Sequence, residues 1–196
     1  KRALLDKMPG NREQKADNLR LLYGYMFAMP GKKLIFMGSE FGEWKEWNHD
    51  TDLDWRLLED PFHSGIRNWV RDLNSTYAGD PALHAREMHP DGFRWVDCSD
   101  EQSSVLSILR TGGSGNEPVL VVLNFTPVVR REYRVGVPLG GAWKEVLNSD
   151  AAEYGGSGEG NLGLVQTDNL PHNGMEQSVT LLLPPMSALF FRHQET

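Results

Sequence analysis

The sequence predicts an α/β segment over residues 1–85 and an antiparallel β-sandwich over residues 86–196. The α/β segment is indicated by the apolar run 34–37, which lies between two stretches whose apolar residues recur at helical spacing. Beyond Asp80 and Pro81 this spacing disappears, and short strand-like runs alternate with turn signals. That change is typical of an all-β domain following an α/β unit.

Two helices are expected on either side of the apolar run. The first covers residues 12–28, because Asn11 and Gln14 have capping-box spacing and a Pro-Gly pair follows the last apolar position. The second covers residues 62–77, and its expected buried stripe consists of Ile66, Trp69, Val70, Leu73 and Tyr77.

The run 34–37 is apolar without alternation, which predicts a strand covered on both faces, as parallel strands are. Such a strand needs neighbouring strands, and the pattern offers no other parallel strand in the chain. We therefore expect residues 1 to about 80 to be the last part of a larger α/β domain. Its other strands would come from preceding sequence or, as the rarer alternative, from partner chains.

Seven short strands are expected in the second half, with a long glycine-rich surface loop over residues 154–174. They cover residues 93–96, 104–109, 119–124, 132–137, 143–147, 178–183 and 188–192. No helical stripe interrupts them, which favours a sandwich.

Charge and composition exclude several classes of protein. A net charge of −7 argues against a nucleic-acid-binding protein, and no apolar stretch approaches the length of a membrane span. The single cysteine, Cys98, excludes an internal disulfide and is typical of a reducing cytoplasm. His49 with Asp50 and Asp52 does not have a recognised metal-ligand spacing, so no metal is expected.

An ordered series of motifs resembles the bacterial 1,4-α-glucan (glycogen) branching enzymes of the α-amylase superfamily, over essentially the whole chain. The resemblance implies a TIM (β/α)8 barrel followed by a C-terminal β-sandwich, with residues 34–37 as the eighth barrel strand. The motifs are Met8-Pro9-Gly10, Phe36-Met37-Gly38-Ser39-Glu40-Phe41, Glu46-Trp47-Asn48-His49-Asp50, Leu53-Asp54-Trp55, Val70-Arg71-Asp72-Leu73-Asn74, Gly92-Phe93-Arg94-Trp95, Asn124-Phe125-Thr126-Pro127 and Leu183-Pro184-Pro185.

The resemblance also implies cleavage of α-1,4-glucan chains and their transfer into α-1,6 branches, without a cofactor. This chemistry needs a nucleophilic Asp, an acid Glu and a second Asp, since carboxylates must flank the glycosidic bond. In the family all three lie on earlier strands, so we assign no catalytic residue here and expect the isolated segment to be inactive. The implied partners are α-1,4-glucan or glycogen and the N-terminal part of the same polypeptide.

Two alternatives stay open at this point. The chain could be a non-catalytic glucan-binding β-sandwich module, or part of another α-amylase superfamily enzyme such as a debranching enzyme. A stand-alone module should not carry an unfinished α/β unit.

Six residues are candidates for contacts with glucan: Glu40, Trp44, Trp47, Trp55, Glu59 and Trp95. The first four follow the predicted strand, where α/β enzymes place their ligand sites. Tryptophan rings suit the apolar faces of sugars, and carboxylates suit their hydroxyl rims. The alternatives are that Glu40 holds the loop through a hydrogen bond, and that the tryptophans form the core of the loop or, for Trp95, of the β domain.

Overall fold

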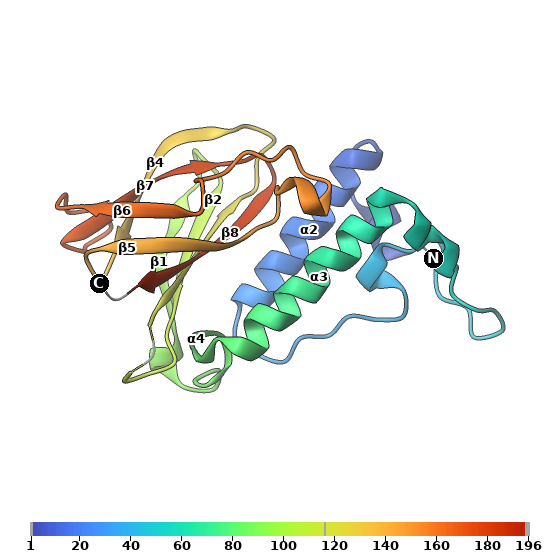
Figure 1. The fold of residues 1–196 in the computed structure, drawn as a ribbon, viewed down its shortest axis with the longest axis horizontal. Helices are drawn as coiled ribbons and strands as arrows, with labels where there is room; N and C mark the ends of the chain where they lie inside the picture. The colour runs from blue at the N-terminus through green and yellow to red at the C-terminus, as the bar shows by residue number, and fades with distance from the viewer. Residues whose placement is uncertain (1, 116, 195–196) are drawn as a thin grey trace.

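The computed structural model describes residues 2–115 and 117–194 and places a helical layer beside an antiparallel sheet (Figure 1). The helices are α1 (Leu4–Lys7), α2 (Arg12–Ala28), α3 (Pro61–Gly79) and α4 (Pro81–His84), with 3-10 turns η1 (Ser39–Phe41), η2 (Trp55–Glu59), η3 (Pro90–Gly92) and η4 (Ala152–Tyr154). The strands are β1 (Phe93–Asp100), β2 (Val105–Arg110), β3 (Val119–Asn124), β4 (Arg130–Val137), β5 (Ala142–Asn148), β6 (Leu164–Asp168), β7 (Gln177–Leu183) and β8 (Ser187–Gln194).

Both long helices begin as predicted. The Asn11 side chain accepts from the Gln14 amide at 2.9 Å, and the Gln14 side chain accepts from the Asn11 amide at 2.9 Å, which completes the capping box of α2. Helix α3 starts one residue earlier than predicted, because Asp60 caps it and Pro61 occupies the first turn. Among the described residues, none of the helices is both long and apolar enough to cross a membrane.

The strands pair only antiparallel, in the order β1-β2-β3-β8-β5-β6-β7-β4, so the predicted antiparallel all-β domain is confirmed. All seven predicted strands are present. The expected long loop over residues 154–174 is wrong in part, because β6 lies within it. Val165 of β6 pairs with Trp143 of β5, and Thr167 pairs with Val179 of β7, so β6 links the two halves of the sheet.

Alternation along β3 and β8 separates two hydrophobic cores. Val119, Val121 and Leu123 pack with the helices, whereas Leu120 and Val122 pack with residues of β4 and β7 on the other face. Every residue of β3 is therefore buried. The helical layer covers one face of this strand pair, and the β4–β7 layer covers the other.

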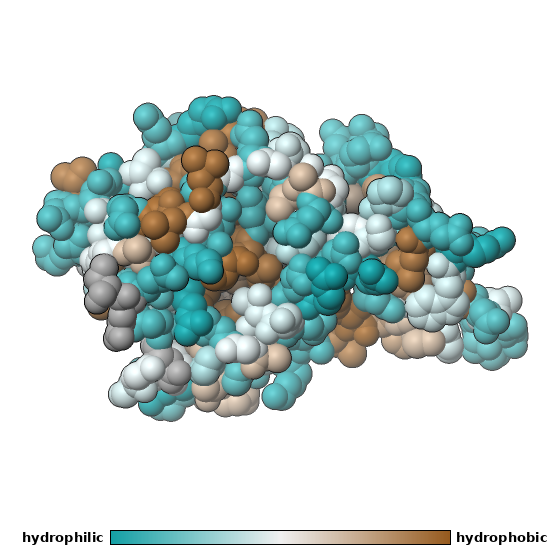
Figure 2. All heavy atoms as spheres, in the orientation of Figure 1, coloured by the Kyte–Doolittle hydropathy of each residue, from teal (hydrophilic) through white to brown (hydrophobic). Residues whose placement is uncertain are grey.

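The predicted strand at 34–37 is wrong for the described chain, because these residues lie in no helix or strand. Leu34 is 82% exposed and Phe36 is 57% exposed. The physical reason is that a strand needs hydrogen-bonded neighbours, and the eight strands of the described residues all belong to the β domain. In Figure 2 a hydrophobic patch lies below α3, where the segment that follows α2 runs.

A buried arginine joins the helical layer to the β domain. The Arg110 guanidinium donates to the carbonyl oxygens of Ala28 at 2.7 Å, Leu83 at 2.9 Å and Gly92 at 2.9 Å. Ala28 and Leu83 lie in the last turns of α2 and α4, where carbonyls have no partner within the helix. Burial lowers the pKa of Arg110 from its ordinary value.

The loop between β5 and β6 docks on α3 through Tyr154. Its ring lies 5.0 Å from that of Trp69, and its hydroxyl donates to Asp72 at 2.9 Å. A side chain at position 65 would meet this loop, since a Cβ on Gly65 would lie 2.7 Å from the Tyr154 carbonyl oxygen. Glycine is therefore required where α3 contacts the loop.

Acid should weaken this docking. The hydrogen bond from Arg71, opposed by burial and aided by the Tyr154 hydroxyl, lowers the pKa of Asp72 from the usual 3.8. A lowered carboxyl pKa contributes stability that is present above the unfolded value and is lost as pH falls through the folded value. We expect the free energy of unfolding to fall as pH drops below 3.8, and Asp72→Asn to reduce this slope.

Urea unfolding at a series of pH values measures the effect. The exposed Asp52 provides the control, and Asp52→Asn should leave the slope as it is in the parent protein. An unchanged slope for Asp72→Asn would show that the Tyr154 contact does not discriminate between the two forms of the carboxyl group.

Candidate functional site

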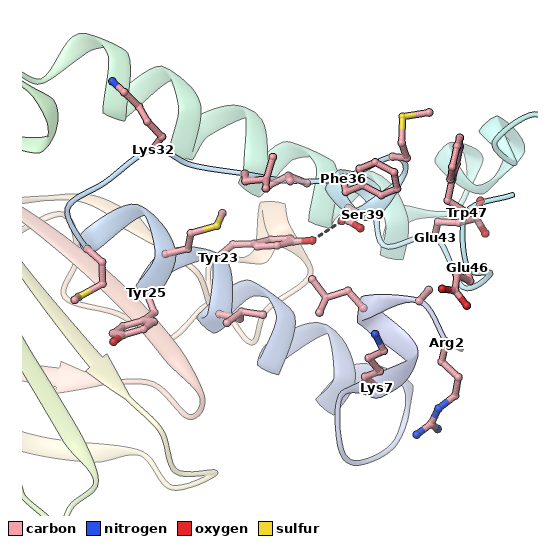
Figure 3. A pocket seen from close by; sticks show the side chains of 18 of the residues that line it. Arg2, Lys7, Tyr23, Tyr25, Lys32, Phe36, Ser39, Glu43, Glu46 and Trp47 are labelled. Atoms are coloured by element: carbon pink, nitrogen blue, oxygen red, sulfur yellow. Dashed lines mark hydrogen bonds between the residues drawn. The ribbon is translucent and has the colours of Figure 1, made fainter. Parts of the chain in front are cut away.

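Two grooves meet at the loop between residues 38 and 56. The first, the apolar groove, has a volume of about 700 Å³ and lies between the α1–α2 helices and residues 30–37 (Figure 3). Its lining includes Leu22, Tyr23, Met26, Leu34, Phe36 and Trp47. The second, the polar groove, has a volume of about 660 Å³, and its lining includes Glu46, Trp47, Asn48, Asp52, Asp54 and Trp55.

The tight start of the loop depends on two glycines. Gly38 (φ 83°) and Gly42 (φ 69°) flank η1 in the left-handed region, which other residues rarely adopt. Tyr23 of α2 fixes this turn by donating its hydroxyl proton to the Ser39 carbonyl at 2.7 Å, as Figure 3 shows. Burial, reinforced by the charge of Glu40, raises the pKa of Tyr23, so this hydroxyl stays a donor.

The carboxylate that holds the loop together is Glu43, which sequence reasoning missed. Glu43 is buried, and it accepts from the amide of Lys45 at 3.2 Å and from the amide of Asp54 at 3.1 Å. These bonds tie the beginning of the loop to its end. Glu40, for which this role was one of the two predicted alternatives, lies half-buried in η1.

Trp44 belongs to the core of the loop. Its indole N–H donates to His63 Nε2 at 3.1 Å, and its ring stacks on Phe62 at 5.8 Å with an interplanar angle of 9°. Because His63 Nε2 accepts this bond, the ring proton lies on Nδ1 and is directed to the Phe41 carbonyl at 2.9 Å. This position favours the packing alternative for Trp44.

Trp47 and Trp55 present exposed aromatic faces to the polar groove. Trp47 is 40% exposed and its ring lies edge-on to Phe36 at 5.4 Å, while Trp55 is 57% exposed and lies against Phe41 at 5.4 Å. Trp47 lines both grooves. Each ring is thus supported from one side by phenylalanine and is accessible on the other.

Polar groups surround these two rings. Asp54 is paired with Arg56 at 3.0 Å, and the hydrogen bond from Arg56 lowers the pKa of this carboxyl group. With Glu46, Asn48 and Asp52 on the same groove, carboxylates and amides lie beside aromatic faces. This arrangement suits a ligand that has apolar faces and hydroxyl edges.

The other two candidates lie apart from both grooves. Glu59 is exposed at the end of η2, and Trp95 is 37% exposed on β1, where its ring contacts that of Phe93 edge-on at 5.0 Å. The structure therefore brings together Trp47 and Trp55 but not the whole predicted set. Within residues 2–115 and 117–194, no group of three or more His, Cys, Asp or Glu side chains is placed to hold a metal ion.

Comparisons with known proteins agree with this organisation. The model of the family described as alpha amylase, C-terminal all-beta domain, matches residues 95–194. Over 194 residues the chain is 55% identical to the 1,4-alpha-glucan branching enzyme GlgB of Aquifex aeolicus, which covers 99% of this chain and 31% of that protein. The GlgB of Thiobacillus denitrificans is 53% identical over 98% of this chain and 26% of its own length.

Solved structures show the same fold at low sequence identity. An Anoxybacillus α-amylase gives a TM-score of 0.63 at 16% identity, covering 93% of this chain and 33% of its own. The Ttha1563 protein of Thermus thermophilus gives 0.62 at 22% identity, covering 98% and 34%. A Nostoc punctiforme debranching enzyme gives 0.57 at 17% identity, covering 93% and 32%.

The chain spans about three tenths of the length of the curated relatives named above. The resemblance read from the motifs is confirmed by these relatives, since the 1,4-alpha-glucan branching enzymes match from one end of the chain to the other. The family model covers the seven paired strands from within β1 to β8 and the strand that sequence reasoning missed. The chain belongs to the family of alpha-amylase C-terminal all-beta domains.

Proposed function

We propose that this chain is the C-terminal part of a glycogen branching enzyme, which cleaves α-1,4-glucan and transfers the released chain to form an α-1,6 branch. The observation that carries the proposal is 55% identity to a 1,4-alpha-glucan branching enzyme over 99% of the chain. The reaction is a retaining double displacement and needs paired carboxylates. We assign those carboxylates to the remainder of the polypeptide.

We further propose that residues 1–85 form the C-terminal end of a (β/α)8 barrel and that residues 86–196 form a β-sandwich docked on it. The exposed segment around Leu34 and Phe36 supports this assignment, because both helices that would flank a barrel strand are already in place. Further strands would cover the apolar groove and pair with this segment. The core shared by the helices and β3 would keep the two parts rigidly together.

Trp47 and Trp55 are proposed to hold a glucan chain beside the barrel. Their supported, exposed rings offer flat apolar area, and the carboxylates of the polar groove offer acceptors for sugar hydroxyls. The enzyme would act in glycogen biosynthesis in the cytoplasm, on α-1,4-glucan. Glu40, Glu59 and Trp95 are proposed as weaker contacts with the same polymer.

The experiment is to produce the complete polypeptide and to count the α-1,6 linkages that it forms from amylose. We expect branching by the complete protein and none by residues 1–196 alone. Trp47→Ala should lower kcat/KM on long chains about tenfold, corresponding to about 1.4 kcal/mol of lost stacking.

Two controls make this result specific. Trp47→Phe keeps a flat ring and should retain most of the activity, and Met88→Ala removes an exposed apolar side chain that lies outside both grooves. A complete polypeptide that binds amylose but forms no α-1,6 linkage would replace the branching enzyme by a glucan-binding protein.

A further inference from the structure

We propose that a groove between the two edge strands of the β domain is a second binding site for α-glucan, distinct from the Trp47–Trp55 groove. The inference rests on the proposed function, because the ligand is the substrate of that enzyme. We call it the seam groove, and its lining includes Asp97, Asp100, Arg130, Arg131, Arg134 and His172.

The seam groove lies where the first and last strands of the sheet approach each other. Strands β1 and β4 stand at opposite ends of the strand order, and each is an edge with unpaired backbone groups. Side chains bridge them: Tyr133 donates its hydroxyl proton to Asp100 at 2.8 Å, and Arg130 donates to the Ser103 carbonyl at 3.1 Å. These bridges leave an opening of about 510 Å³, within the ~300–1,000 Å³ usual for small-ligand pockets.

The bridging groups are held in fixed protonation states and positions. The Ser103 amide and the Tyr133 hydroxyl, against the opposing effect of burial, lower the pKa of Asp100. Asn173 donates to Asp97 at 3.2 Å and accepts from the Gly136 amide at 2.9 Å. Both carboxylates of the groove are therefore oriented by partners before any ligand arrives.

Charge balance in the groove favours a neutral ligand. Arg134 is paired with Asp168 at 2.8 Å, and Arg131 with Glu159 at 3.4 Å, so neither guanidinium is an uncompensated positive charge. A phosphate would lie against Asp97 and Asp100 and would be repelled. A sugar hydroxyl both donates and accepts, so it can bond carboxylate and guanidinium groups in the same groove.

One buried donor in the seam has no partner. Arg130 Nε is buried and makes no hydrogen bond within the described residues, which is a costly state for a polar atom. The Tyr133 hydroxyl gives its proton to Asp100 and so keeps its lone pairs for an incoming donor. A hydroxyl-rich chain offers the acceptor that Arg130 needs and the donor that Tyr133 can receive.

The test uses the complete polypeptide and measures hydrogen exchange of its backbone amides with and without maltoheptaose. We expect maltoheptaose to slow exchange in the segments 97–103 and 129–134. Arg130→Lys keeps the positive charge but removes the Nε donor, and it should weaken the dissociation constant read from this protection at least fivefold. Arg67→Lys on the exposed face of α3 is the matched control and should leave it unchanged.

Tyr133→Phe provides a second variant, with the same expected weakening. A wild-type seam that gains no protection, or equal protection by inorganic phosphate, would overturn the proposal. So would Arg130→Lys and Tyr133→Phe variants that bind as the wild type does. Branching activity is measured on the same preparations: activity without seam protection refutes the seam site alone, whereas absence of activity refutes the proposed function.

Discussion

Replacing Arg110 by methionine should lower the free energy of unfolding by about 3 kcal/mol. Methionine fills much of the same space but leaves the carbonyls of Ala28, Leu83 and Gly92 without their donor, and each unpaired buried group costs ~1–3 kcal/mol. Release of a desolvated guanidinium offsets part of this loss, which sets our value toward the lower end. Urea unfolding of the protein, followed by tryptophan fluorescence, measures the change.

The contacts of Arg110 also predict how substitutions should rank. Arg110→Lys keeps the charge beside two helix C-termini but cannot reach three carbonyls from one ammonium group, so it should fall between the parent and Arg110→Met. Arg94→Met, on the exposed side of β1, should stay within ~0.5 kcal/mol of the parent. Equal stability of Arg110→Met and Arg94→Met would show that the three carbonyls find other partners.

Local patterns were sufficient to predict the helices and most strands. The capping box at Asn11 and Gln14 is a local signal, and so is the alternation along β3. Strand β6 escaped prediction because only Val165 and Thr167 turn inward within a glycine-rich stretch, and its register depends on β5 and β7. Its signal, an alternating pattern beside two β-branched residues, is short but present in the sequence.

The segment 34–37 shows why an apolar run cannot specify a strand by itself. Its side chains suit a strand covered on both faces, but backbone pairing is supplied by other segments of chain. In the described residues no strand lies beside it, and Leu34 and Phe36 line the apolar groove instead. The pattern therefore describes the surroundings that the segment suits, and these lie outside its own sequence.

The same limit applies within the candidate site. Glu40 and Glu43 are three residues apart, and the left-handed turn at Gly38 and Gly42 decides that Glu43 points inward to bond two amides. Trp44 is withdrawn from the surface by its partner His63, which is distant in sequence. Clustering of tryptophans predicted the loop as a site, but only the fold separates platform residues from core residues.

Truncating Trp69 to alanine should have the largest effect of any substitution in the helical layer, a loss of about 4 kcal/mol. Trp69 is fully buried, its indole N–H donates to the Arg20 carbonyl at 2.9 Å, and its ring contacts Tyr154. The substitution thus opens a cavity among α2, α3 and the β5–β6 loop, and it also removes a hydrogen bond. Thermal and urea unfolding give the size of the loss.

The position of Trp69 gives a regional readout that overall stability does not. Because Tyr154 packs on this ring, amide exchange in residues 149–158 should accelerate in Trp69→Ala more than exchange in β3 does. Trp69→Phe keeps an aromatic surface but loses the bond to Arg20 and should cost about 1–2 kcal/mol. Trp55→Ala, which removes an exposed ring, is the control for the loss of a tryptophan. A Trp69→Ala protein as stable as Trp55→Ala would mean that the helical layer does not pack on the β domain through this residue, since filling that interface is what makes the ring costly to remove.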